Sequence, residues 1–516
     1  MSGVLRMPAQ SCRVTAAKRA VTTVTAAALI AATLTPAPTA AGRSVSHGPI
    51  HLPVVLMAAI DESPTTLGIA DSNLYTLSEA DLKTTLDELQ SLGVTDVRIA
   101  VPWIFVQPNS SQSYDWSKLD MVVNAIAERD MGVLGVISGT PAWAGFPLNG
   151  HPNPATYAAF ASAVATRYQG KISAYEVWNE PNGVTFWSPV SAKAYTDLLK
   201  AAYPAIKAAD PDATVIGGVL GAVGNIPGVS TSAVKFVTQM YTDGAHGFFD
   251  AMSFHPYHYV TPFSKGTMSG EPIEQVAAIR ALMAANGDAD LKLWATEYGL
   301  PTSVVSQAQQ AAYIHDFVVA WQQVNGAGPM FIYTTRDTAT GAFDDEANFG
   351  IFTTNWTPKL AAETVAALIA DLADGTAEPF DVTPYMPANP FLQGVQVFIR
   401  QLINQALVVP KFIVQLVNSA INAVVKTIAG ALGIPTAGRT AAARPSAPAA
   451  QTAATPTPGR AVATSKRQPA TAGNTPSPAA ASTPSTQRRS KPAQQRADRT
   501  ASGGTTGHSS TGHSAR

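Results

Sequence analysis

Hydrophobic residues in the central part of the chain follow two alternating patterns. Short runs of consecutive apolar residues are each followed by a longer segment in which apolar residues recur every three or four positions. The short runs are typical of strands buried on both faces, and the longer segments are typical of amphipathic helices. Ser78–Leu92 illustrates the second pattern, because Ser78 is a favourable N-cap and Gly93 ends the periodicity.

These patterns predict eight strands and eight helices in strict alternation. The predicted strands are Val54–Ile60, Asp96–Trp103, Gly132–Ser138, the first half of Ile172–Pro181, Thr214–Val219, Ala251–Tyr257, Lys292–Gly299 and Met330–Thr335. The predicted helices are Ser78–Leu92, Ser117–Asp130, Pro154–Tyr168, Ser191–Ala209, Thr231–Tyr241, Pro272–Ala285, Ser306–Val324 and Pro358–Leu372. Such an alternation places a parallel sheet inside a layer of helices.

Eight strand-plus-helix units predict an α/β fold, a (β/α)8 TIM barrel, over residues 44–375. The active site of such a barrel lies at the C-terminal ends of its strands. A doubly wound open sheet is the alternative. It is disfavoured because chemically interesting residues end many different strands, and because no Gly-x-Gly-x-x-Gly motif follows the first strand.

Charge is distributed unevenly along the 516 residues, although the formal net charge is only −1. The first 43 residues carry five Lys and Arg and no acid. Residues 436–516 carry eleven Lys and Arg and one acid. The region between them has 18 basic and 34 acidic residues, a net charge of −16. An acidic body argues against nucleic acid as the ligand, whereas a neutral polysaccharide is indifferent to the charge.

The N-terminal segment 1–41 has the pattern of a secretory signal peptide. Basic residues precede a mildly apolar run, Val21–Leu34, and a small-residue stretch follows, with cleavage expected near Ala40 or Ala41. The run is too short and too weak for an uncleaved membrane anchor. Cys12 is the only cysteine, so the mature protein would have neither a disulfide nor a thiolate metal site. We expect a secreted or envelope-associated protein.

The chain changes character after the predicted barrel. Residues 390–435 are strongly apolar, and Pro410 divides them into two amphipathic helices. These helices either pack on the barrel or on each other, or they lie on a membrane surface. Residues 436–516 are rich in Ala, Pro, Thr, Ser and Arg and are predicted to be disordered, with a charge of +10. The tail is either a solvated tether or a contact to an anionic envelope surface.

Two glutamates stand at the ends of predicted strands. Glu180 lies between Asn179 and Pro181 after an aromatic strand, and Glu297 ends the strand that Lys292 begins. The ends of strands four and seven face each other across a barrel mouth, and a carboxyl separation of about 5–5.5 Å gives a retaining glycosidase. Glu180 is predicted to be the acid/base and Glu297 the nucleophile. Arg98 and Tyr257, on strands two and six, are predicted to keep Glu297 ionised and oriented.

These motifs resemble clan A of the glycoside hydrolases, which carry the acid/base on strand four and the nucleophile on strand seven. Trp-Asn-Glu-Pro at 178–181 and Thr-Glu-Tyr-Gly at 296–299 match the clan's two motifs. Residues 92–103, 114–120 and 140–144 look most like the family 39 xylosidase and iduronidase type, with the cellulase-like family 5 close behind. The resemblance implies a (β/α)8 retaining hydrolase of oligo- or polysaccharides. It also implies that Asn179 binds the sugar 2-hydroxyl and that His255 contacts sugar beside the cleaved bond.

The eighth strand departs from the clan pattern, because many members have a tryptophan platform where this chain has Phe-Ile-Tyr-Thr-Thr-Arg-Asp at 331–337. Tyr333 is the expected substitute. Trp143, like Trp103, is predicted either to stack on sugar or to belong to the core. His255 and His258 lack the companions of a zinc site, so no cofactor or metal is expected.

Two other functional classes stay open beside the hydrolase. The first is a catalytically inactive carbohydrate-binding or envelope protein on the same barrel. The second is a different barrel enzyme, such as an aldolase or isomerase. The second class would need a Schiff-base lysine, a phosphate site or metal ligands at strand ends, and Lys292 lies at the wrong end of its strand. The sequence indicates neither the sugar nor the oligomeric state.

Overall fold

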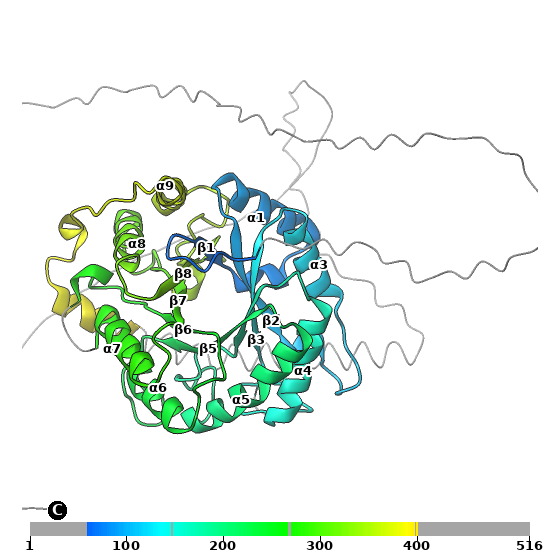
Figure 1. Ribbon diagram of the computed structural model, residues 1–516. Coiled ribbons are helices and arrows are strands. Elements are labelled where there is room, and N and C mark those ends of the chain that lie inside the picture. Colours follow the sequence, from blue (N-terminus) through cyan, green and yellow to red (C-terminus); the bar gives the residue numbers. More distant parts are fainter. Residues whose placement is uncertain (1–58, 146–147, 267–269, 398, 401–516) are drawn as a thin grey trace, which may run out of the picture. The chain divides into compact units, whose positions relative to one another are not determined.

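A closed barrel of eight parallel strands forms the centre of the protein. The computed structural model describes residues 59–145, 148–266, 270–397 and 399–400. Each strand pairs with its neighbours in chain order, and β8 pairs with β1 to close the sheet. Figure 1 shows the strands at the centre and the helices around them. The closed sheet confirms the predicted (β/α)8 barrel and excludes the open doubly wound sheet.

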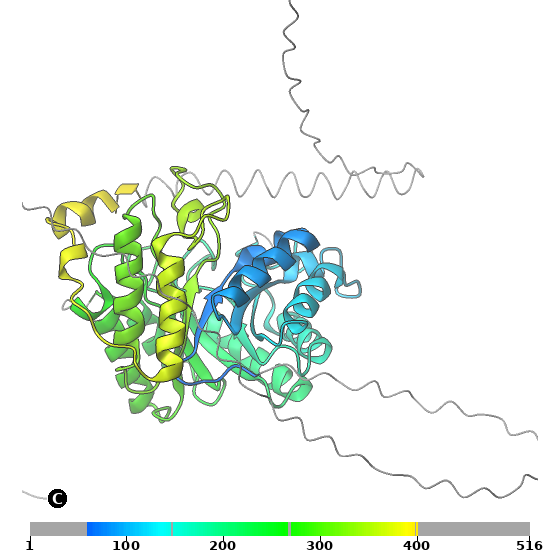
Figure 2. The same ribbon diagram turned by 90° about the horizontal axis from the view of Figure 1, so that it is seen from above.

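The described elements alternate as the sequence predicts except after β2, where Trp103, predicted to end the strand, instead begins a short additional helix. The strands are β1 (Leu67–Ala70), β2 (Asp96–Pro102), β3 (Gly132–Ser138), β4 (Ala174–Val177), β5 (Thr214–Gly221), β6 (Ala251–His255), β7 (Lys292–Tyr298) and β8 (Ala327–Tyr333). The helices are α1 (Glu79–Ser91), α2 (Trp103–Val106), α3 (Ser117–Ala127), α4 (Pro154–Arg167), α5 (Ala192–Ala209), α6 (Ala233–Thr242), α7 (Pro272–Ala285), α8 (Gln307–Trp321) and α9 (Leu360–Asp374). Figure 2, turned by 90°, shows α8 and α9 side by side along the barrel wall.

The predicted first strand is wrong. The barrel begins with Leu67–Ala70, and the described end of the predicted segment, residues 59–60, is not in a strand. Ile60 instead packs inside the barrel with Ala174 and Trp294, and its N–H donates to Ser173 Oγ at 3.2 Å. The apolar character of Ile60 therefore reflects closure of the N-terminal end of the barrel, and strand pairing starts seven residues later.

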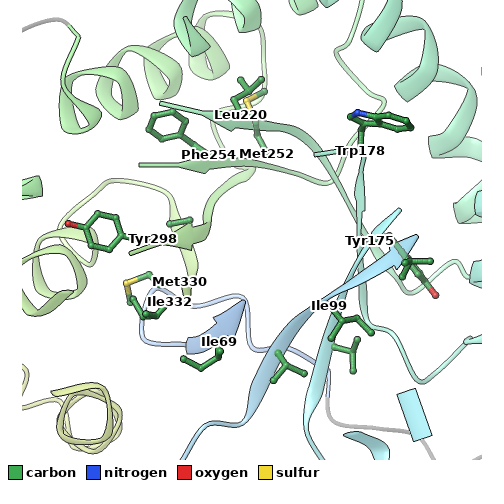
Figure 3. Close-up of a cluster of buried hydrophobic side chains, with 14 of the residues drawn as sticks. Ile69, Ile99, Tyr175, Trp178, Leu220, Met252, Phe254, Tyr298, Met330 and Ile332 are labelled. Carbon is green, nitrogen blue, oxygen red and sulfur yellow. The ribbon is translucent and has the colours of Figure 1, made fainter. Parts of the chain in front are cut away.

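The outer face of the sheet is covered by apolar contacts with the helices. Figure 3 shows this layer, in which side chains such as Ile69, Tyr175 and Met330 project from the strands. Because side chains alternate across a strand, the neighbouring residues point into the barrel. The two faces of each strand thus belong to different clusters, and both are buried, as the near-continuous apolar runs predict.

The interior of the barrel is apolar at one end and polar at the other. Leu134, Ala174, Trp294 and Phe331 belong to the apolar cluster inside the barrel. Nearer the C-terminal ends of the strands, fully buried Glu176 and Ser253 and nearly buried Arg98 replace them. Because buried charges require partners, we expect the polar side chains of this layer to bind one another.

Several predicted segments lie outside the described residues. They are the signal peptide 1–41, residue 398 and residues 401–435 of the predicted pair of helices, and the tail 436–516. Residues 390–397 and 399–400 are helical, Phe391 is 82% exposed, and Arg400 pairs with Asp345 in the loop after β8. Among the described residues, none of the helices has the length and apolarity needed to cross a bilayer.

Candidate active site

Glu180 lies just beyond β4, where the chain turns away from the barrel. Its backbone has a φ of 42°, and its N–H donates to the Val219 carbonyl at 2.8 Å. Non-glycine residues in this region are uncommon and cluster at functional sites. The carboxyl group rests on Gly221, where a Cβ would come within 3.0 Å of Glu180 Cδ. Glycine at 221 therefore makes room for the carboxyl group of Glu180.

Glu297, near the end of β7, is held by two donors. An Nη1 hydrogen of Arg98 is donated to Oε1, and the Tyr257 hydroxyl donates to Oε2 at 2.7 Å. Burial alone would raise the pKa of Glu297. The positive charges of His255 and Arg98, with the hydrogen bond from Tyr257, outweigh burial and lower this pKa below the usual carboxyl value. Glu297 is therefore ionised at neutral pH.

Arg98 organises the polar layer from β2. Besides binding Glu297, it donates from Nε to Glu176 Oε2 at 2.7 Å and from Nη2 to Asn179 Oδ1 at 2.8 Å. Ser253 Oγ donates to the other oxygen of Glu176 at 2.7 Å. The fork geometry of the guanidinium thus fixes three side chains at once, which are Glu176 in β4, Asn179 just beyond β4 and Glu297 in β7.

Glu176 is a member of this network that sequence reasoning missed. Its side chain is fully buried at the centre of β4. A lone carboxylate within an apolar strand was the available signal, because such a group must be paired to be tolerated.

His255, at the end of β6, bridges the two glutamates. Its Nδ1 lies 2.8 Å from Glu180 Oε1 and 3.7 Å from Glu297 Oε2, and its Nε2 contacts Thr296 Oγ1 at 3.1 Å. Burial lowers the pKa of His255, but the charges of Glu297 and Glu180 outweigh burial and raise it. The raised pKa favours a protonated imidazole between these two acidic side chains.

The two glutamates lie close together. Oxygen atoms of Glu180 and Glu297 and a ring nitrogen of His255 all lie within 4.8 Å of one another. Such a set could hold a divalent metal ion, although the guanidinium of Arg98 on Glu297 competes with any cation. His258 accepts from the Thr261 N–H at 2.9 Å and so closes a turn.

Tyr333 lies at the end of β8, beside Tyr257. Its ring meets the Tyr257 ring edge-on at 6.5 Å, and its hydroxyl donates to Glu346 Oε2 at 3.3 Å. Glu346, in the loop after β8, was also missed by sequence reasoning. It had no local signal, because only the fold of this loop brings it to the strand ends.

Trp143 lies in the loop after β3, half-buried, with Nε1 donating to the Gln107 carbonyl at 2.7 Å. Its ring meets Trp103 edge-on, and Trp103 is fully buried. Of the two predicted roles, sugar stacking or core packing, Trp103 therefore has the second. Within the described residues, Trp143 makes its hydrogen bond to Gln107 and its ring contact with Trp103, and neither joins it to a glutamate, so its sugar-binding role stays a prediction.

The structure thus brings most of the predicted site residues into one network. The residues joined by hydrogen bonds or ion pairs are Arg98, Asn179, Glu180, His255, Tyr257 and Glu297. Two carboxylates of different surroundings, an imidazole and a guanidinium suit acid/base and nucleophilic chemistry on a polyhydroxylated ligand.

Comparison with known proteins gives three findings. A family model described as cellulase (glycosyl hydrolase family 5) matches residues 60–331. The endoglucanase CelA of Streptomyces lividans is 48% identical over 62 residues, which are 12% of this chain and 12% of that protein. A family 39 glycoside hydrolase of Bacteroides cellulosilyticus WH2 has the same fold, with 24% identity, a TM-score of 0.50, and coverage of 60% of this chain and 64% of that one.

Proposed function

Because the chain belongs to glycosyl hydrolase family 5, the cellulase family, we propose that it is a retaining glycosidase that cleaves O-glycosidic bonds of an oligo- or polysaccharide. Membership of this family confirms the resemblance to clan A. The observation that supports the retaining mechanism is the closeness of the two glutamates, since one oxygen atom of each lies within 4.8 Å of the other. Inverting enzymes separate their carboxyl groups by about 6.5–9.5 Å to admit a water molecule.

The reaction proceeds by double displacement. Glu297 attacks the anomeric carbon while the proton of Glu180 passes to the leaving oxygen, so that the glycosidic bond breaks and a glycosyl ester forms. Glu180, now a carboxylate, then takes a proton from water. The water oxygen attacks the anomeric carbon and releases Glu297 as a carboxylate.

The surrounding residues prepare each step. Arg98 and Tyr257 hold Glu297 ionised and aimed, and His255 fixes the position of Glu180. Asn179, whose oxygen is held by Arg98, would donate from Nδ2 to the sugar 2-hydroxyl. These groups are pre-organised by buried contacts, which is how enzymes favour the transition state over the bound substrate.

A substrate panel tests the proposed function. We expect the protein to cleave at least one para-nitrophenyl glycoside or soluble polysaccharide, with cellulosic substrates included because one relative is named an endoglucanase. Proton NMR of the first product should show retention of the anomeric configuration. Inversion would refute the double displacement. Binding of a polysaccharide without cleavage of any substrate would instead support the inactive binding protein.

We also propose that segment 1–41 directs export and that the apolar, basic region beyond residue 400 holds the protein at the cell envelope. In fractionated cells we expect the full chain in the envelope fraction, with a mature N-terminus after Ala40 or Ala41 by mass spectrometry. A chain ending at Arg400 should appear in the medium with the same activity on a soluble glycoside. Equal envelope retention of both chains would refute the role of residues 401–516.

A further inference from the structure

The loop after β8 carries a third carboxylate toward the two glutamates. Glu346 lies on η3 (Asp345–Asn348), and the Tyr333 hydroxyl donates to its Oε2 at 3.3 Å. Tyr333 in turn meets Tyr257, which binds the nucleophile Glu297. A chain of three aromatic and acidic contacts thus connects Glu346 to the side of the site where the anomeric carbon would be attacked.

The loop that carries Glu346 is fixed by buried polar contacts. Asn348 donates from Nδ2 to the carbonyls of Ala342 and Asp344, at 2.9 and 2.7 Å. Lys359, fully buried, donates to Asp337 at 2.8 Å and to the Asn348 carbonyl at 3.2 Å. A side chain on a loop with this many internal bonds is pre-organised, as residues that read a ligand need to be.

The electrostatic surroundings of Glu346 are negative. Burial by neighbouring atoms and the charges of Glu297, Glu180 and Asp344 raise the pKa of Glu346 to about 7. The side chain of Glu346 also has surface exposed to solvent. Because Glu346 is exposed and its Oε2 meets the Tyr333 hydroxyl at the strand ends, it is accessible to a ligand at this end of the barrel.

We propose that Glu346 is a specificity-determining residue of the glycone subsite, where its carboxylate accepts hydrogen bonds from sugar hydroxyls and excludes sugars that carry a carboxylate. The inference rests on the proposed function and names its substrate class, a neutral or amino-substituted glycone. The glycone side is favoured because Glu346 reaches the nucleophile through Tyr333 and Tyr257.

Two physical effects give this selectivity. Hydrogen bonds from hydroxyl groups to a carboxylate are stronger than those between neutral groups. The carboxylate therefore favours binding of a sugar whose hydroxyl groups lie within hydrogen-bonding distance. A uronate in the same place would lie opposite several like charges, and Arg98 is already bound to Glu176, Asn179 and Glu297.

The test pairs the best neutral para-nitrophenyl glycoside of the panel with para-nitrophenyl β-D-glucuronide, at a pH about one unit above the pKa of Glu346 so that this carboxylate is ionised. Glu346→Gln should lower kcat/KM on the neutral glycoside about tenfold and raise the uronide-to-neutral ratio about tenfold. Glu346→Asp keeps the charge and should keep the ratio. Glu363→Gln, which removes an exposed carboxylate from α9, is the matched control and should change neither value.

The outcomes separate this inference from the proposed function. If Glu346→Gln folds, as circular dichroism will show, and its kcat/KM and ratio match the wild type, the role of Glu346 is overturned while the hydrolase stands. Preference of the wild-type protein for the glucuronide also overturns it. If the wild-type protein cleaves none of the glycosides, the proposed function is overturned, and the inference about the substrate class is overturned as well.

Discussion

Glu297→Gln is expected to lower kcat/KM on every glycoside by about 10⁴-fold or more, whatever the leaving group. Glu180→Gln should behave differently. On a dinitrophenyl glycoside, whose leaving group needs little protonation, its kcat/KM should fall by no more than about tenfold. On an alkyl or sugar leaving group the loss should reach about 10²–10⁴-fold, because general acid catalysis is then required.

Intact-mass spectrometry supplies a readout that is independent of rates. Glu180→Gln slows attack by water, so it should accumulate a glycosyl adduct on the protein during turnover of the dinitrophenyl glycoside. Glu297→Gln has no nucleophile and should show no adduct. An adduct on the Glu297 variant, or the same dependence on leaving group in both variants, would contradict the assigned roles. Glu363→Gln again controls for loss of a carboxylate outside the site.

Much of the fold followed from hydrophobic periodicity, and the reasons differ between elements. The bounds of β3 and α7 agree with the sequence prediction, since glycine or proline begins each and the apolar pattern is continuous. β1 was misplaced because a four-residue strand, Leu67–Ala70, has a weaker signal than the apolar run before it. Periodicity reports burial, and Ile60 is buried by closing the barrel without pairing in the sheet.

The candidate site was predictable where chemistry coincided with a strand end. Glu180, Glu297 and His255 lie at or just beyond the C-terminal ends of their strands, so the barrel topology alone places them together. Arg98 is the third residue of β2 and reaches them with its long side chain. Glu346 could not be found in this way, because it lies in a long loop whose course depends on contacts such as Arg400 with Asp345. The sequence pattern shows where strands end, but it does not show how loops return over them.

Replacement of Glu176 is expected to have the second large effect on activity, because the negative charge of Glu176 offsets the positive charge of Arg98. Glu176→Gln keeps the shape of the side chain, and glutamine Oε1 still accepts from Arg98 Nε. The variant should fold, with Arg98 still paired with Glu297, but kcat/KM should fall about 100-fold. The negative charge that offsets the guanidinium is lost, so Arg98 draws more electron density from Glu297 and weakens it as a nucleophile.

The pH profile of Glu176→Gln separates this electrostatic role from a structural one. Loss of a nearby negative charge favours ionised Glu297, so its pKa, already lowered by His255 and Arg98, should fall further. The acid limb of kcat/KM should therefore move to lower pH, by roughly one unit. If glutamine merely displaced Arg98, Glu297 would lose its cation and the limb would move to higher pH. Ser253→Ala removes a hydrogen bond from Glu176 without removing charge, so its limb should stay in place.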